Sequence, residues 1–126
     1  MQDIYIEKTT SMPAVSFKNT GEIKLEGRAL PENASVFFDP LKKWASEVDV
    51  KEINIEFNLD YFNTSVSKQL MDLFRNFENN HNIETINITW MYEDGDEEML
   101  ESGEVYEEML KRFHFTFQKY AEIVNQ

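Results

Sequence analysis

Two neighbouring hydroxyl side chains, Thr64 and Ser65, stand where one sequence pattern gives way to another. Before them, apolar and polar residues alternate, as in a strand with one buried face. After them, apolar residues from Val66 to Phe77 recur at the spacing of an amphipathic helix. The hydroxyls therefore lie at a helix amino terminus, where unpaired backbone N–H groups favour a negative group: a carboxylate, a bound anion or a phosphoryl group on a hydroxyl.

A plainer interpretation makes Thr64 or Ser65 an ordinary helix cap, worth about 1 kcal/mol. Two features favour a charged group instead. Lys68 lies in the first turn, where a cation opposes the helix dipole unless an anion is nearby. A capping box requires Glu or Gln three residues after the cap, and those positions hold Ser67 or Lys68. The junction is suited to a negative group that it does not itself carry, and phosphorylation would supply about −1.5 to −2 charges.

The other groups that could do chemistry are acidic. Residues 93–98 lack the spacing of an EF-hand loop, so we interpret them as a solvated turn with helix-starting acids, with an acidic rim for a basic partner as the alternative. Asp60 and Glu56 could act as an acid–base pair, although charged residues on a wet sheet face are commoner. The sequence has no glycine-rich phosphate loop and no evident catalytic triad. We expect no enzyme activity, no cofactor and no metal.

Composition narrows the class of partner. The chain has 126 residues, enough for a single domain over residues 1–126, and a formal net charge of −12. This charge argues against nucleic acid and anionic membranes as partners. The absence of cysteine excludes disulfides, thiolate zinc sites and cysteine nucleophiles. No apolar run is long enough for a signal peptide or a bilayer span, so we expect a cytoplasmic protein.

The hydrophobic pattern predicts the elements that position the junction. Strands are expected at 4–6, at 15–17 and 23–25 as a hairpin turning at Gly21, and at 52–59, 86–90 and 113–117. Residues 27–33 are expected to be an irregular connection. Helices are expected from Pro40 to about 48, with Asp39 as the cap, and at 66–77, followed by one or two short helical pieces around Gly103.

Alternating strands and helices predict an α/β fold with a mixed sheet of five to six strands. Parallel strands covered on both faces would be apolar throughout, yet 52–59 and 86–90 alternate cleanly. The helices should therefore pack mainly on one face. The other face, which carries Asn54, Asn58, Asn87 and Thr89, is expected to be wet, thinly covered or used by a partner.

Four blocks, at residues 27–33 (GRALPEN), 37–41 (FFDPL), 61–65 (YFNTS) and 96–104 (DEEMLESGE), together resemble the SiaC-like regulatory phosphoproteins. The resemblance extends over most of the chain, with the four blocks in the family's order and at fitting distances. The resemblance implies a STAS-like fold and a partner switch. In such a switch a cognate Ser/Thr kinase modifies a residue at the strand–helix junction and a PP2C-type phosphatase reverses the modification.

The resemblance places the phosphoacceptor at Thr64, with Ser65 as the alternative. It also implies an effector such as a diguanylate cyclase, bound by the unphosphorylated form. We expect the partner contact to use Asn63, Ser65, Lys68, Gln69 and Asp72 around the junction, together with Arg28. The competing hypothesis is a constitutive adaptor that dimerises through the polar sheet face without control by phosphorylation.

Overall fold

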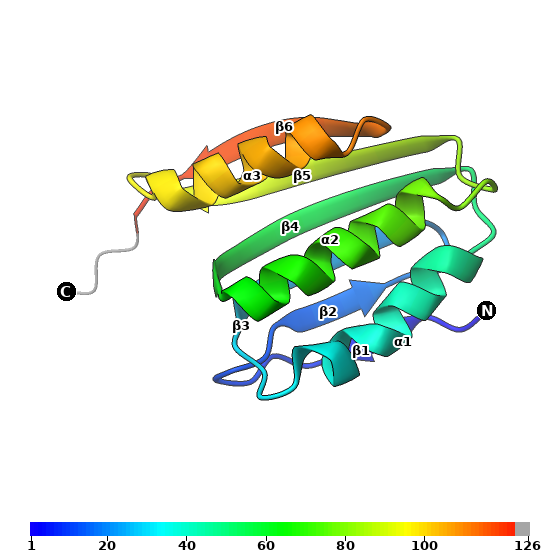
Figure 1. Cartoon of the computed structure of the whole chain (residues 1–126), viewed down its shortest axis with the longest axis horizontal. Helices are drawn as coiled ribbons and strands as arrows, with labels where there is room; N and C mark the ends of the chain where they lie inside the picture. Colours follow the sequence, from blue (N-terminus) through cyan, green and yellow to red (C-terminus); the bar gives the residue numbers. More distant parts are fainter. Residues whose placement is uncertain (123–126) are drawn as a thin grey trace.

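Six strands lie side by side in the order in which they occur in the chain (Figure 1). The computed structural model describes residues 1–122. Its elements are β1 (Ile4–Ile6), β2 (Ala14–Phe17), β3 (Glu22–Ala29), α1 (Ala34–Glu47), β4 (Glu52–Phe62), α2 (Thr64–Glu78), β5 (Thr85–Glu93), α3 (Glu97–Met109) and β6 (Phe113–Tyr120).

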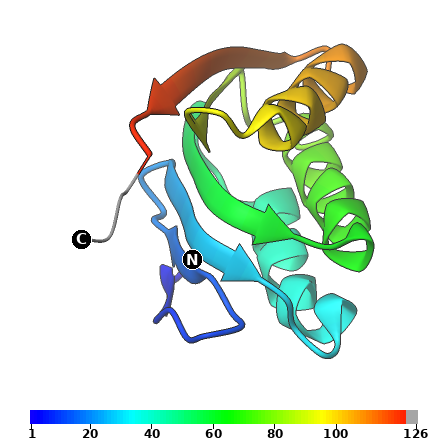
Figure 2. The same cartoon turned by 90° about the vertical axis from the view of Figure 1, so that its left-hand side faces the viewer.

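The sheet is antiparallel at one side and parallel at the other. β1, β2 and β3 pair antiparallel, and β3 to β6 pair parallel, with one helix in each parallel connection. The hairpin between β2 and β3 turns at Gly21, whose φ of 101° suits a residue without Cβ. All three helices lie on the same face of the sheet (Figure 2), as expected for crossovers of one hand. The predicted mixed α/β sheet with one helical face is confirmed. Within residues 1–122 no helix combines the length and apolar character that crossing a membrane requires.

The core fills the space between the sheet and the helices. Every second residue of β4 and β5 is buried there, and each such side chain contributes about 1.5–3 kcal/mol. At its centre Trp90 stacks on Phe57, with ring centroids 3.9 Å apart and planes 9° from parallel. The opposite face carries the polar residues of the same strands, so the two faces differ as predicted.

Helix α1 begins earlier than predicted. Asn33, not Asp39, is its cap, and the Asn33 side chain accepts a hydrogen bond from the Val36 N–H at 3.3 Å. Pro40 therefore lies inside the helix, where it removes one backbone donor. The helix tolerates this because the turns before Pro40 bury Ala34 and Phe38 against the core. The prediction that Pro40 is the first residue of this helix was therefore wrong.

Helix α3 is continuous, where one or two short pieces were predicted. Gly103 lies in its interior and lets the helix approach the sheet. A Cβ at this position would lie 2.7 Å from Phe117 Cε1 and 2.7 Å from Trp90 Nε1. The same indole nitrogen donates a hydrogen bond to the Met99 carbonyl at 2.9 Å. Close packing against β5 and β6 therefore offsets the low helix propensity of glycine.

Gly103→Ala should lower the free energy of unfolding by about 1–3 kcal/mol, because overpacking against two rigid rings outweighs the better helix propensity of alanine. Urea unfolding followed by circular dichroism measures this. Glu101→Ala, at an exposed position of the same helix, is the matched control and should change the value by less than about 0.5 kcal/mol. A Gly103→Ala protein as stable as the wild type would contradict the close packing described for α3.

Candidate functional site

The strand that leads into the junction carries a bulge near its end. Gly27 of β3 faces Leu59 of β4, but the next residue, Arg28, faces Tyr61, so Asp60 has no opposite residue. The extra residue shifts the alternation by one position, which turns Phe62 towards the helices, beside Phe57 and Trp90. The predictions that the strand ends at 59 and that 27–29 is irregular were wrong because the bulge hides the continuing pairing.

Asn63 caps helix α2. Its backbone is extended (φ −91°, ψ 178°), and its Oδ1 accepts a hydrogen bond from the Val66 N–H at 3.0 Å. Val66 is fully buried and anchors the first turn in the core. The plainer interpretation of Thr64 or Ser65 as the cap is therefore wrong, because asparagine, an equally favoured cap, precedes them. Both hydroxyl residues belong to the first turn instead.

The two hydroxyls differ in their surroundings, although both residues are exposed. Ser65 Oγ donates a hydrogen bond to Asn63 Oδ1 at 2.8 Å and so takes part in the cap. Thr64 is the first residue of the helix, and its hydroxyl has no hydrogen-bond partner among residues 1–122. Of the two, Thr64 is the one whose hydroxyl is free to be modified without loss of a structural contact.

Thr64 lies at a groove between α2 and α3, which we call the α2–α3 groove. It encloses about 470 Å³. Its walls leave apolar surface in contact with solvent, since Val105 is 54% exposed and Met109 is 45% exposed. The lining residues are Thr64, Ser67, Lys68, Met71 and Asp72 from α2, and Ser102, Val105, Tyr106 and Met109 from α3.

A tyrosine joins the two helices beside this groove. Tyr106 is 4% exposed, and its hydroxyl donates to the Ser67 carbonyl at 2.9 Å. The Ser67 hydroxyl lies 2.9 Å from the same phenol oxygen. Burial raises the pKa of Tyr106, and the hydrogen bond with Ser67 opposes this rise. The phenol therefore stays neutral and fixes the spacing of the helices.

The charges around Thr64 favour an anion. Helix α2 has no acidic residue in its first turn, whereas α3 begins with Glu97 and Glu98. The positive end of the α2 dipole is therefore not offset by a carboxylate of its own first turn. Because α2 begins at Thr64, Lys68 lies in its second turn and not in the first as predicted; it is exposed and adds a positive charge on the same side as the groove. Asp72 lines the same groove further along α2, so the positive charge is confined to the helix start and Lys68 in a chain whose net charge is −12.

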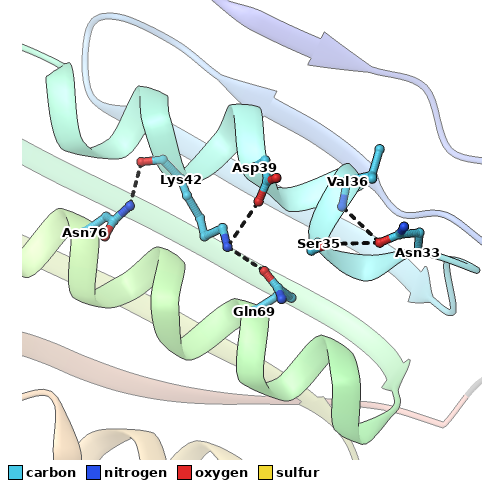
Figure 3. Close-up of polar contacts among 7 residues, drawn as sticks. All are labelled: Asn33, Ser35, Val36, Asp39, Lys42, Gln69 and Asn76. Atoms are coloured by element: carbon cyan, nitrogen blue, oxygen red, sulfur yellow. Dashed lines mark hydrogen bonds and ion pairs between the residues drawn. The ribbon is translucent and has the colours of Figure 1, made fainter.

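Gln69, one of the predicted contact residues, turns towards α1 instead, and so does Asn76 (Figure 3). Gln69 Oε1 accepts a hydrogen bond from Lys42 Nζ at 2.7 Å, and the same ammonium lies 3.3 Å from Asp39. Asn76 Nδ2 donates to the Lys42 carbonyl at 2.9 Å. Gln69 and Asn76 thus hold α1 against α2, whereas Lys68 and Asp72 face the α2–α3 groove.

Arg28 lies away from the groove. Its guanidinium carbon is 5.9 Å from the centre of the Tyr61 ring. It lines a separate hollow of about 600 Å³ with Gly27, Asp60 and the segment that holds Lys8, Thr9 and Thr10. The structure therefore brings Thr64, Lys68 and Asp72 together and places Arg28 in a second hollow.

The acidic groups considered for catalysis do not assemble into one site. Glu56 forms an ion pair with Lys24 at 3.2 Å in one hollow, and Asp60 lines another. In the acidic run, Asp96 caps α3 by accepting from the Met99 N–H at 3.1 Å, and Glu97 and Glu98 occupy the first turn. The prediction of a turn with helix-starting acids is confirmed. Among residues 1–122, no group of three or more His, Cys, Asp or Glu is placed to hold a metal ion.

Sequence reasoning missed the α3 side of the groove. Val105 and Met109 are four residues apart and so share one helix face. That spacing was the available signal, but the expected break at Gly103 hid the helix that carries it. Which helix lies opposite could not be deduced from the spacing.

Comparisons with known proteins agree over nearly the whole chain. A family model described as "SiaC family regulatory phosphoprotein" matches residues 6–120. An uncharacterized protein of Pseudomonas aeruginosa (strain UCBPP-PA14) is 27% identical over 127 residues, which cover 97% of this chain and 100% of that protein.

Solved structures from Pseudomonas aeruginosa show the same fold. SiaC in a crystal structure of the diguanylate cyclase SiaD in complex with its activator SiaC is 26% identical, with a TM-score of 0.85, covering 94% of this chain and 100% of that chain. A further structure of SiaC is 25% identical, with a TM-score of 0.79, covering 97% of this chain and 100% of that chain.

Asn63→Ala should lower the free energy of unfolding by about 1 kcal/mol, because the first turn of α2 loses its cap. Asn63→Asp keeps an acceptor oxygen in the same place and adds a negative charge at the helix start, so it should be at least as stable as the wild type. Thermal and urea unfolding of the two variants measure the difference. Equal loss in both would mean that the Asn63 side chain does not act as a cap.

Tyr106→Phe should lower the free energy of unfolding by about 1 kcal/mol at neutral pH, because the hydrogen bonds to Ser67 are lost. The raised pKa adds a pH dependence. In the unfolded chain the Tyr106 phenol ionises at the ordinary pKa of 10.0, whereas in the folded chain its pKa is higher. The stability that comes from keeping the phenol neutral is therefore present below pH 10.0 and is lost as the pH rises above it. Urea unfolding across this range should show the wild type losing stability more steeply than Tyr106→Phe. Parallel curves would contradict the assignment.

Proposed function

Because this chain belongs to the SiaC family of regulatory phosphoproteins, we propose that it is a non-catalytic switch whose phosphoacceptor is Thr64. In this scheme the unphosphorylated protein binds a signalling partner. A cognate Ser/Thr kinase modifies Thr64 and releases the partner, and a PP2C-type phosphatase restores binding. The observation that carries the proposal is the exposed Thr64 hydroxyl, without a partner among residues 1–122, at the start of α2 and beside the α2–α3 groove.

We assign the partner to the diguanylate-cyclase class. The SiaC chain whose structure matches 94% of this chain occurs in complex with such a cyclase and is described as its activator. The likeness in fold supports a partner of the same class for this chain. It leaves the choice of cyclase to side chains that differ between two proteins 26% identical.

The contact surface proposed for the effector combines the junction and the groove. Asn63, Thr64 and Ser65 form its start, and Lys68 and Asp72 extend it along α2. The exposed apolar side chains of Val105 and Met109 give the groove surface that a partner would bury. Arg28 would serve as a contact outside the groove, and Gln69 would act by holding α1 in place.

A phosphate on Thr64 would weaken such a complex through desolvation. Bringing a doubly charged group into an interface with apolar walls costs a few kcal/mol unless a designed partner receives it. Each 1.4 kcal/mol changes the dissociation constant tenfold. The fold need not change, because Thr64 is exposed and its hydroxyl makes no hydrogen bond among residues 1–122. Lys68 is suited to pair with the phosphate once the partner has left.

The decisive comparison is between Thr64→Asp and Thr64→Ala. Thr64→Asp should weaken binding to a diguanylate cyclase from the same organism by at least about tenfold, because it places a charge in the contact, whereas Thr64→Ala should bind as the wild type does. Titration calorimetry measures binding, and cyclase turnover measures activation. Ser46→Asp, at an exposed position of α1 outside the proposed contact surface, is the matched control and should bind as the wild type does.

Intact-mass measurement and peptide mapping after expression in the native host test the acceptor itself. A single added phosphate should map to Thr64 and disappear in Thr64→Ala but not in Ser65→Ala. Phosphate on Ser65 alone would overturn the choice of acceptor. Equal binding by Thr64→Asp and Thr64→Ala would support a constitutive adaptor instead.

A further inference from the structure

The two edges of the sheet differ in length. β1 forms one edge and has three residues, whereas β6 forms the other and has eight. Figure 1 shows β6 as the outermost strand beside β5. Within residues 1–122 no strand pairs with the outer side of β6, so its backbone N–H and C=O groups on that side are available for pairing.

β6 lacks the features that usually keep an edge strand from pairing. It contains no proline, and its register with β5 runs from Phe113 to Tyr120 without a shift. It carries no acidic residue, although the chain has 24, and Lys119 near its end is its one lysine. Natural edge strands are commonly protected by prolines, bulges, short length or several charges.

The side chains of β6 separate into an apolar row and a neutral polar row. On the helix side, Phe113, Phe115 and Phe117 follow one another at ring distances of 6.1 and 5.8 Å. Phe115 and Phe117 are only half-buried, so this row leaves aromatic surface in contact with solvent. On the opposite side, His114, Thr116 and Gln118 are exposed.

We propose that β6 is a self-association edge, which pairs antiparallel with β6 of a second copy of this chain. A two-fold axis perpendicular to the sheet gives antiparallel pairing and keeps the helices of both copies on one side. The aromatic row then meets the aromatic row, and the polar row meets the polar row. No carboxylate of β6 faces another, so the edge is complementary to itself.

The pairing leaves the α2–α3 groove open. Helix α3 packs on β5 and β6, and Figure 1 shows α2 on the side of α3 away from the β6 edge. The α2–α3 groove therefore lies away from the free edge. A paired molecule would therefore display two grooves and two Thr64 hydroxyls. The self-association does not depend on the proposed function, since β6 and Thr64 share no contact in the structure described.

Net charge sets the expected salt dependence. Two copies of a chain with charge −12 repel each other, and the exposed acids Glu104, Glu107 and Glu108 of α3 lie close to this half of the sheet. Raising sodium chloride from about 0.05 M to about 0.5 M should strengthen the association, because the Debye length falls well below the size of the protein.

Sedimentation equilibrium of the full chain tests the edge with two matched substitutions. Thr116 of β6 and Thr89 of β5 are direct partners in the sheet and face its open side. Thr116→Glu should raise the dimer dissociation constant by about tenfold or more, and Thr89→Glu by much less, because only the first charge lies at the new contact. A monomeric wild type at all concentrations overturns the proposal, and so does an equal effect of both substitutions, which indicates pairing through the sheet face.

Disulfide trapping gives a second readout that does not depend on affinity. The chain has no cysteine, so single substitutions report their own contacts. Antiparallel partners lie about 4.5–5.5 Å apart between Cα atoms, within the reach of a disulfide. A residue lies opposite its own copy only where the two-fold axis passes, so each central position of β6 is substituted singly. Under mild oxidation, at least one of His114→Cys, Phe115→Cys, Thr116→Cys, Phe117→Cys and Gln118→Cys should form a covalent dimer, and Thr89→Cys should not. No cross-link from any of the five β6 positions, or an equal yield from Thr89→Cys, would overturn the pairing.

Discussion

The hydrogen bond from the Val66 N–H to Asn63 Oδ1 decides what the junction can do. The amide oxygen of Asn63 accepts from a backbone N–H that would otherwise have no partner at the start of α2, so Thr64 need not serve as the cap. Burial of Phe62 on one side and Val66 on the other fixes the three residues between them. Thr64 is consequently held at the surface by its neighbours, and its hydroxyl makes no hydrogen bond within residues 1–122. The proposed modification by a kinase would require this combination of a rigid backbone and an accessible hydroxyl.

A one-sided sheet divides the molecule into surfaces with different properties. The helical side supplies the core and, between α2 and α3, a groove with exposed apolar walls. The open side is polar and contains its own ion pairs, such as that of Lys24 with Glu56 and Glu26. The aromatic row of β6 reaches the rim where these two sides meet. These surfaces differ enough in shape and polarity for each to contact a different neighbour.

Periodicity predicted most of the elements, because each strand has one buried face and each helix one apolar stripe. The predicted element boundaries were wrong where a bulge, a proline or a glycine interrupts the hydrophobic pattern. The unpaired Asp60 shifts the alternation and hides the last residues of β4, while the packing of Phe38 carries α1 through Pro40. A break at Gly103 was predicted from the low helix propensity of glycine. The close approach of Gly103 to Trp90, which explains why the helix continues, is visible only in three dimensions. The hydroxyls at the junction were identified from the sequence, whereas the α3 wall of the groove required knowing which helices are neighbours.

The lack of acidic residues in the first turn of α2 constrains how this protein can evolve or be engineered. Glutamate there is a standard way to make a helix more resistant to heat. If Thr64 is the phosphoacceptor, as we propose, such a residue would imitate the phosphate and make the two forms of the junction alike. Stability towards heat and response to phosphorylation would then be opposed at this turn.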